Sequence, residues 1–236
     1  ESVLYPVEYN EVNVGGTVSL MTAARDAGVR RVVLASSGTV YGEQEEQPVK
    51  ESALARPPNP YAVSKLASEY YLSALGALDD IEAVMLRIFN AYGPGQAVPP
   101  SHPPVIPHFI RQALSGSTPT IFGSGKQSRD FIYINDVVDA LTTAGMVDNA
   151  DGLIINIGSG KEVSINDLVK KIEELLGKRV LALHNPGQSG GVSRLVADTE
   201  LAQKILGFRA KVDIDEGLRL LLRRPEELVP SNAGDR

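Results

Sequence analysis

The chain has 236 residues, of which 43% are hydrophobic and 22% charged, with a net charge of −6 and no cysteine. This composition is ordinary for a globular protein with a substantial core, and the acidic balance argues against a nucleic-acid or anionic-membrane surface. The lack of cysteine excludes disulfides and thiolate chemistry, and the three histidines show no metal-ligand spacing. No apolar run reaches membrane-spanning length, so we expect a soluble, cytoplasmic protein without a metal site.

Helices and buried strands alternate along the first half of the chain. The predicted elements are a helix over 9–27, a strand over 32–35, a loop over 42–60, a helix over 61–75 and a strand over 83–89. Both strands are continuously apolar, which is typical of strands buried on both faces of a parallel sheet. Gly28 ends the first helix, and Asn59-Pro60 supplies a capping side chain and a first-turn proline for the second.

The second half alternates in the same way. Its predicted elements are a loop over 90–101, a helix over 105–114, a strand over 118–122, a turn over 123–125, an extended segment over 131–134, a helix over 136–146 capped by Asn135, a strand over 153–157, a helix from the Ser164 cap to 176 and a helix capped by Asp198 or Thr199 that ends at 206. We expect the tail after Leu228 to be frayed. The alternation indicates an α/β fold with a parallel sheet.

Tyr61 and Lys65 form the most informative pair in the sequence. They stand four residues apart, on one face of the helix predicted over 61–75. A cation held near a phenol favours the phenolate, which makes a usable base near neutral pH. Ser36 and Ser37 end the preceding buried strand, and hydroxyl, tyrosine and lysine together are suited to removing a proton from a sugar or alcohol. Chance alone supplies such a Tyr/Lys pair in about one chain of three, so the surrounding segments decide.

One signature of a dinucleotide-binding fold is absent from the sequence. Such a fold opens with a strand, a glycine-rich turn and a helix that receives the pyrophosphate. Here Gly15-Gly16 lies inside a helical pattern, and the other glycine pairs follow loops. The chain also begins at Glu1 without a methionine, so we expect its front to be missing.

Short segments spread in order along the chain carry a family resemblance. They are Asn13-Val14-Gly15-Gly16-Thr17, Ser36-Ser37-Gly38-Thr39-Val40-Tyr41-Gly42, Tyr61 to Lys65, Arg87-Ile88-Phe89-Asn90-Ala91-Tyr92-Gly93-Pro94, Arg129-Asp130-Phe131-Ile132-Tyr133-Ile134, Asn156-Ile157-Gly158-Ser159-Gly160, and Val196-Ala197-Asp198 followed by Leu206-Gly207-Phe208. These segments resemble the extended short-chain dehydrogenase/reductase family, and within it the NAD-dependent sugar-nucleotide epimerases and dehydratases of the UDP-glucose 4-epimerase type.

The resemblance implies a fold and a division into domains. The fold would be the second half of a Rossmann-type, doubly wound parallel sheet with a smaller C-terminal α/β substrate domain. Residues 1–93 and 131–160 would be the remainder of the NAD-binding domain, and residues 94–130 and 161–236 the substrate domain. About 75 residues with the glycine fingerprint would precede Glu1 in the complete protein.

The resemblance also implies roles for the catalytic and cofactor-binding residues. Tyr61 would be the catalytic base, Lys65 would hold the phenolate and the nicotinamide ribose, and Ser37 would bridge the substrate and the tyrosine. Asn13 and Phe89, together with the three catalytic residues, fall at positions that contact NAD in the family. The alternatives are that Lys65 is a solvated helix lysine and that Phe89 only packs in the core.

The implied partner is a UDP-sugar. Its predicted contacts are Ser37, Thr39, Asn90, Val105, Ile106, Thr120, Phe122, Arg129, Gln188, Arg194 and Leu195. Arg129 suits a phosphate, with a surface salt bridge to Asp130 as the alternative reading. Gln188 stands where the family commonly has a second phosphate arginine, and Arg194 nearby is the candidate to compensate. Leu195, smaller than an aromatic residue, leaves an N-acetyl sugar conceivable.

The strand-end sequence favours one reaction over others. Related dehydratases carry an acid after the strand-end hydroxyl, whereas this chain has Gly38-Thr39, so the resemblance implies NAD-dependent 4-epimerisation of a UDP-hexose through a 4-keto sugar. The alternatives are a UDP-glucuronate or UDP-N-acetylhexosamine 4-epimerase, less favourably a dehydratase or reductase, and a non-catalytic dinucleotide-binding scaffold. The helices over 13–27 and 61–75 are those through which relatives commonly dimerise, so we expect a homodimer.

Overall fold

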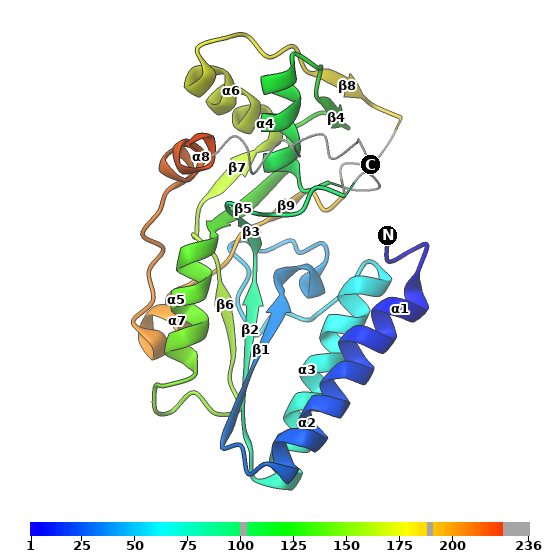
Figure 1. Ribbon diagram of the computed structural model, residues 1–236, viewed down its shortest axis with the longest axis vertical. Coiled ribbons are helices and arrows are strands. Elements are labelled where there is room, and N and C mark those ends of the chain that lie inside the picture. Colours follow the sequence, from blue (N-terminus) through cyan, green and yellow to red (C-terminus); the bar gives the residue numbers. More distant parts are fainter. Residues whose placement is uncertain (100–102, 188–190, 224–236) are drawn as a thin grey trace, which may run out of the picture.

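The computed structural model describes residues 1–99, 103–187 and 191–223. The end of the predicted loop at 100–101, Gln188 and the tail after Leu228 therefore lie outside the described residues. Figure 1 shows two halves: a lower half in which helices cover both faces of a sheet, and an upper half of shorter strands and helices. The α/β class with parallel strands agrees with the prediction, and none of the helices in the described ranges is long and apolar enough to cross a membrane.

The lower half is built on a three-stranded parallel sheet. Its strands β1 (Arg31–Ser37), β2 (Glu82–Ile88) and β6 (Ile154–Ile157) lie in the order β1-β2-β6. These are the predicted buried strands, each within a few residues of its predicted range. Helices α2 (Gly16–Asp26) and α3 (Pro60–Asp79) cover one face, and α5 (Ile134–Ala144) and α7 (Glu200–Leu206) cover the other. The continuously apolar strand sequences are explained by this two-sided cover.

The first helical run begins earlier than predicted. It consists of α1 (Pro6–Asn10), a π-helical turn (Glu11–Gly15) and α2, and it ends before Gly28 as predicted, with Gly28 at φ 65°. Pro6 occupies the first turn of α1, where a missing N–H is tolerated. The π-helical turn, which the apolar pattern does not predict, contains Asn13.

Helix α3 carries the Tyr/Lys pair and begins where the sequence predicts. The side chain of Asn59 accepts a hydrogen bond of 2.9 Å from the backbone N–H of Ala62, and Pro60 occupies the first turn. The helix continues past its predicted end at 75 and stops at Asp80, which adopts a left-handed conformation with φ 56°. Between β1 and α3, a 3₁₀ turn (Gly38–Tyr41) starts the long loop.

The upper half surrounds its own apolar core. Its elements are β3 (Asn90–Tyr92), α4 (Val105–Ser115), β4 (Thr120–Phe122), β5 (Ser128–Tyr133), β7 (Glu162–Ser164), α6 (Ile165–Leu176), β8 (Leu183–Asn185), β9 (Arg194–Leu195) and α8 (Ile214–Leu222). Ile110, Phe131 and Leu168 are among the buried residues of this core. Ser164 caps α6 through the N–H of Asp167, as predicted.

Two predictions in this half need correction. The segment after Asn90 leaves the three-stranded sheet as predicted, but Asn90–Tyr92 is a strand rather than a loop, because it pairs in parallel with β5. Asn135 does not cap α5, which begins at Ile134 with Tyr133 before it and no side-chain cap. Strands β7, β8 and β9 and helix α8 were not predicted. Thr199 stands at the N-cap of α7 without a side-chain cap hydrogen bond, and the carboxylate of Asp198 before it accepts from the N–H of Glu200.

The side chain of Asp130, within β5, holds two loops against this strand. Asp130 is fully buried, and its carboxylate accepts from the N–H and hydroxyl of Ser159 and from the N–H groups of Gly160 and Ala197, at 2.6 to 3.1 Å. Burial raises the pKa of this carboxyl, and the hydrogen bonds oppose that rise. The buried carboxylate of Asp130 therefore depends on these hydrogen-bond donors to offset the cost of its burial.

Changing Asp130 to asparagine is expected to destabilise the fold by about 2–3 kcal/mol, because an amide NH₂ would face backbone donors in a buried site. Denaturant unfolding followed by circular dichroism measures this. The exposed Asp148 supplies the control, since Asp148→Asn should stay within about 0.5 kcal/mol of wild type. Equal stability of the two variants would contradict the role given to Asp130.

Candidate active site

A cavity of about 450 Å³ lies where β1 and β2 end and where α3 and α4 begin. The carboxyl ends of parallel strands are the usual place for a ligand in such a sheet. The predicted site residues that line the cavity are Ser37, Thr39, Tyr61, Lys65, Phe89, Asn90, Val105, Ile106 and Leu195. Residues far apart in the sequence are thus brought together around one space.

Lys65 reaches from α3 to the backbone of the neighbouring strand. Its Nζ donates a hydrogen bond of 3.0 Å to the carbonyl of Ala35 and lies 6.0 Å from the centre of the Tyr61 ring. Burial lowers the pKa of Lys65. The side chain is therefore held at the cavity wall, which disfavours the reading of a solvated helix lysine.

Tyr61 is half-buried, and its ring packs edge-on against Tyr9 with ring centres 6.0 Å apart. This contact comes from α1, so the first helical run packs against the ring of the candidate base. Tyr61 and Lys65 both line the cavity, as one turn of helix between them requires.

The two hydroxyls at the end of β1 have different surroundings. Ser37 is buried, its Oγ lies 2.9 Å from the Thr39 hydroxyl, and it accepts from the Thr39 N–H at the start of the 3₁₀ turn. Ser36 instead donates to the carboxylate of Glu69 inside the protein. The hydroxyl of Ser36 is thus engaged by Glu69, whereas that of Ser37 contacts Thr39.

Several predicted residues lie outside the cavity wall. The amide of Asn13 donates 2.9 Å to the hydroxyl of Ser64, the neighbour of Lys65, and so joins the first helical run to α3. Thr120 and Phe122 lie on β4 with exposed side chains. The structure does not bring these three residues to the cavity.

The candidate phosphate residues lie in and beside β5. The Arg129 guanidinium donates to its neighbour's carbonyl, that of Ser128, at 2.7 Å, and burial lowers its pKa. A surface salt bridge with Asp130 is disfavoured, because Asp130 is fully buried with other donors. Arg194 forms a two-pronged pair with Glu162 at 2.7 and 2.8 Å. Gln188 lies outside the described residues.

Sequence reasoning missed part of the cavity wall. Gln96 lines it and donates from Nε2 to the carbonyl of Ala91 at 3.2 Å. Pro104 just before α4, Pro107 in its first turn and Phe131 on β5 line it as well. In the sequence, these residues are distinguished only by lying near predicted strands or loops, because their residue types carry no chemical signature.

The structure also bears on metal chemistry. Within residues 1–99, 103–187 and 191–223, no group of three or more histidine or carboxylate side chains is placed to hold a metal ion. The cavity instead combines hydroxyls, a phenol and an ammonium, which suit proton transfer to and from an alcohol.

Comparison with protein families places these features in a known group. The model of the NAD dependent epimerase/dehydratase family matches residues 1–158. A curated protein from Methanocaldococcus jannaschii, described as a putative UDP-glucose 4-epimerase, is 37% identical over 219 residues, which cover 92% of this chain and 70% of that protein. The chain spans about two thirds of the length of the curated relatives that it matches.

Two solved structures illustrate the similarity in three dimensions. UDP-glucose 4-epimerase from Thermotoga maritima, solved with UDP-glucose, is 30% identical with a TM-score of 0.90, and the match covers 96% of this chain and 73% of that one. UDP-glucuronic acid 4-epimerase from Bacillus cereus, solved with UDP-glucuronic acid and NAD, is also 30% identical, with a TM-score of 0.83 and coverage of 92% and 68%.

Proposed function

The chain belongs to the NAD-dependent epimerase/dehydratase family, and from this premise we propose that it inverts C4 of a UDP-hexose of the UDP-glucose/UDP-galactose type, with NAD as cofactor. The observation that carries the proposal is the convergence of Ser37, Tyr61 and Lys65, from β1 and α3, on one cavity. A phenol, an ammonium and a hydroxyl so placed can take a proton from a sugar hydroxyl and return it.

In the proposed reaction, the Tyr61 phenolate oxygen removes the proton of the sugar 4-hydroxyl and later returns it to the re-formed hydroxyl. The Lys65 ammonium stabilises the phenolate, and the Ser37 hydroxyl bridges the sugar oxygen and the tyrosine. C4 passes through a 4-keto sugar that rotates in the cavity before reduction on its other face. Bound NAD supplies the reversible hydride exchange at C4.

The residues at the cavity fit the nicotinamide end of such a cofactor. The bond to Ala35 uses one of the three N–H donors of Lys65, so the ammonium has donors for a ribose hydroxyl as well. Ser37, Tyr61 and Phe89 line the same wall. Asn13 is retained as a proposed contact on resemblance alone, since its amide bonds to Ser64.

Epimerisation is favoured over dehydration by the composition of the wall. Expulsion of a hydroxyl needs an acid to protonate it. Among the described residues that line the cavity there is no Asp or Glu, and Gly38 and Thr39 occupy the segment where dehydratases carry an acid.

The proposal also assigns the two halves. Residues 1–93 and 131–160 are assigned to the NAD side, and residues 94–130 and 161–236 to the UDP-sugar side. The apolar cores divide differently at two points: Ala202 and Leu206 of α7 pack in the core of the three-stranded sheet, and Phe131 and Tyr133 of β5 pack in the core of the upper half. We propose Thr39, Asn90, Val105, Ile106 and Leu195 as substrate contacts at the cavity, and Thr120, Phe122, Arg129 and Arg194 as contacts beyond it. Gln188, outside the described residues, is proposed as a substrate contact from the sequence.

A homodimer remains a prediction. Val12, Leu20, Tyr70 and Leu78 on α2, α3 and the π-helical turn are more than half exposed in the single chain, which is consistent with a partner surface on these helices.

A panel of UDP-sugars tests the function. The complete protein, with NAD, should interconvert UDP-glucose and UDP-galactose faster than UDP-glucuronate or UDP-N-acetylglucosamine and their C4 epimers, as followed by NMR. Preferred turnover of another pair would move the assignment to that substrate. Absence of turnover with every pair would favour the non-catalytic scaffold.

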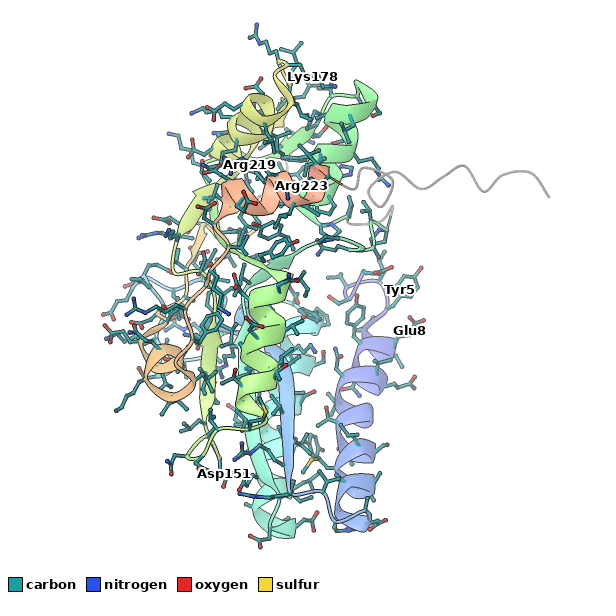
Figure 2. All side chains as sticks on the ribbon, turned by 60° about the vertical axis from the view of Figure 1, so that its left-hand side comes forward. Tyr5, Glu8, Asp151, Lys178, Arg219 and Arg223 are labelled. Atoms are coloured by element: carbon teal, nitrogen blue, oxygen red, sulfur yellow. The ribbon has the colours of Figure 1, made fainter. Side chains whose placement is uncertain are left out.

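Arg129→Met is expected to raise KM for the UDP-sugar by about tenfold or more with a smaller change in kcat, because a charge-assisted phosphate contact is lost. Steady-state kinetics measure this. Arg219→Met is the matched control, since Arg219 on α8 (Figure 2) pairs with Glu216 at 3.0 Å and is 53% exposed. An unchanged KM in Arg129→Met would remove Arg129 from the substrate site.

A further inference from the structure

Three polar residues lie side by side across the three-stranded sheet, one residue before the ends of β1 and β2 that line the cavity. Ser36, Arg87 and Asn156 are register partners on β1, β2 and β6. All three are buried, whereas most of the other buried residues of these strands are apolar. Parallel strands buried on both faces favour continuous apolar sequence, so this row needs a separate explanation.

Glu69 on α3 meets this row as a buried ion pair. Its carboxylate accepts from the Arg87 guanidinium at 2.7 and 3.0 Å, and it also accepts from the Ser36 hydroxyl. The Glu69 and Arg87 side chains are only 2% and 4% exposed. Burial by itself lowers the pKa of Arg87, but the hydrogen bonds and charge of Glu69 together with the Tyr41 phenol outweigh it, so the pKa of Arg87 is raised and its guanidinium stays charged.

The network continues to the far edge of the sheet. The Arg87 guanidinium lies 4.6 Å from the centre of the Tyr41 ring, and the Tyr41 hydroxyl donates to Asn156 at 2.7 Å. The Asn156 amide donates to the carbonyl of Val49 at 2.8 Å. Burial raises the pKa of Tyr41 to about 12, so this hydroxyl remains a donor at neutral pH.

The members of this network adjoin the candidate catalytic groups. Glu69 lies one helical turn beyond Lys65 on α3, and Ser36 directly precedes Ser37. The bond from Lys65 to Ala35 spans the same gap between α3 and β1 as the bond from Ser36 to Glu69. Fixing this gap fixes the distance between the tyrosine and the serine.

Stability alone does not account for such a pair. Replacing a buried ion pair by apolar side chains of similar volume is often neutral or stabilising, because desolvation offsets the attraction. Directional hydrogen bonds, unlike apolar packing, hold a helix at a single register against its neighbouring strand.

We propose that Glu69 and Arg87 are positioning residues that hold the α3 face carrying Tyr61 and Lys65 against the strand end carrying Ser37. Turnover depends on the pair more than folding does. The inference rests on the proposed epimerase function, and its test includes a measurement that does not.

The test uses the complete protein with an apolar replacement of the pair, Glu69→Leu with Arg87→Met. We expect kcat to fall roughly 10- to 100-fold, with KM for the UDP-sugar within about threefold of wild type, since a displacement near 1 Å costs that much turnover. Thermal unfolding should show that the variant is folded. A folded variant with kcat within about twofold of wild type would overturn the inference.

The matched control is a pair at the other end of the same strands. Glu82 at the start of β2 pairs with Arg31 at the start of β1. Glu82→Gln should lower stability and leave kcat unchanged; a fall in kcat equal to that of the double variant would show that general loosening of the sheet is responsible, and would overturn the inference.

Two further measurements keep the test decisive. If the double variant does not fold, Ser36→Ala replaces it: a fall in kcat of about three- to tenfold at unchanged KM supports the inference, and unchanged kcat overturns it. If wild type shows no turnover, the proposed function fails, and crystal structures of the folded variants decide. A Ser37–Tyr61 separation that changes in the pair variant but not in Glu82→Gln supports the inference, and an unchanged separation overturns it.

Discussion

Replacing Tyr61 by phenylalanine is expected to lower kcat by about a thousandfold or more, because the group that exchanges the proton of the sugar hydroxyl is removed. The ring remains, so its edge-on contact with Tyr9 and the start of α3 should persist. The loss should therefore appear in kcat with KM little changed, which identifies a group used in the transition state.

Steady-state kinetics of the purified variant with UDP-glucose measure the effect. Tyr70→Phe is the matched control: Tyr70 is on the same helix, is 67% exposed and lies outside the cavity wall, so its kcat should equal that of wild type. Turnover by Tyr61→Phe close to the wild-type rate would mean that another group is the base.

Replacing Lys65 by methionine is expected to lower kcat by roughly 10²-fold or more, since the phenolate loses its cation and the cavity loses an ammonium donor. The pH dependence of kcat/KM should change as well. Burial lowers the pKa of Lys65, so its ammonium loses the proton at lower pH than that of an exposed lysine. Wild-type kcat/KM should consequently fall on the alkaline side, and this alkaline limb should be absent from the variant.

The measurement is a pH series of kcat/KM for both proteins. Lys178→Met serves as the control, because Lys178 is exposed at the end of the upper half (Figure 2) and does not line the cavity. A variant that keeps both the wild-type rate and the alkaline limb would show that Lys65 has no part in the chemistry.

Local signals predicted much of the fold. Asn59 and Ser164 cap helices because the cap geometry needs only neighbouring residues, and their positions were readable from the sequence. Strands β3 and β9 were not, since each is short and exists through pairing with β5, which lies far away in the chain. Helix α8 was not predicted for the same reason, because its apolar face is explained only by its packing against the core of the upper half.

The candidate site divides along the same line. The spacing of Tyr61 and Lys65 could be read directly, because one helix sets it. Gln96 at the wall could not be found, since nothing in its type or spacing distinguishes it. The Glu69–Arg87 ion pair could not be predicted either, because the sequence does not show that these two charged residues are both buried and in contact.

Asn13 shows that the helix carrying a motif residue can be predicted while the local backbone geometry and side-chain partner cannot. The helical pattern put it on the first helix, and the structure agrees. Its amide, however, bonds to Ser64 of α3 from within a π-helical turn, a local geometry that apolar periodicity does not encode.

Reversible hydride exchange at C4 of the sugar, with Tyr61 as the proton acceptor, can be followed with UDP-glucose that carries deuterium at C4. This substrate is incubated with the complete protein and NAD in ordinary water, and the products are examined by NMR. UDP-galactose that keeps its deuterium at C4 is the expected product. Replacement of that deuterium by solvent hydrogen would show that C4 is not inverted by hydride exchange with bound NAD.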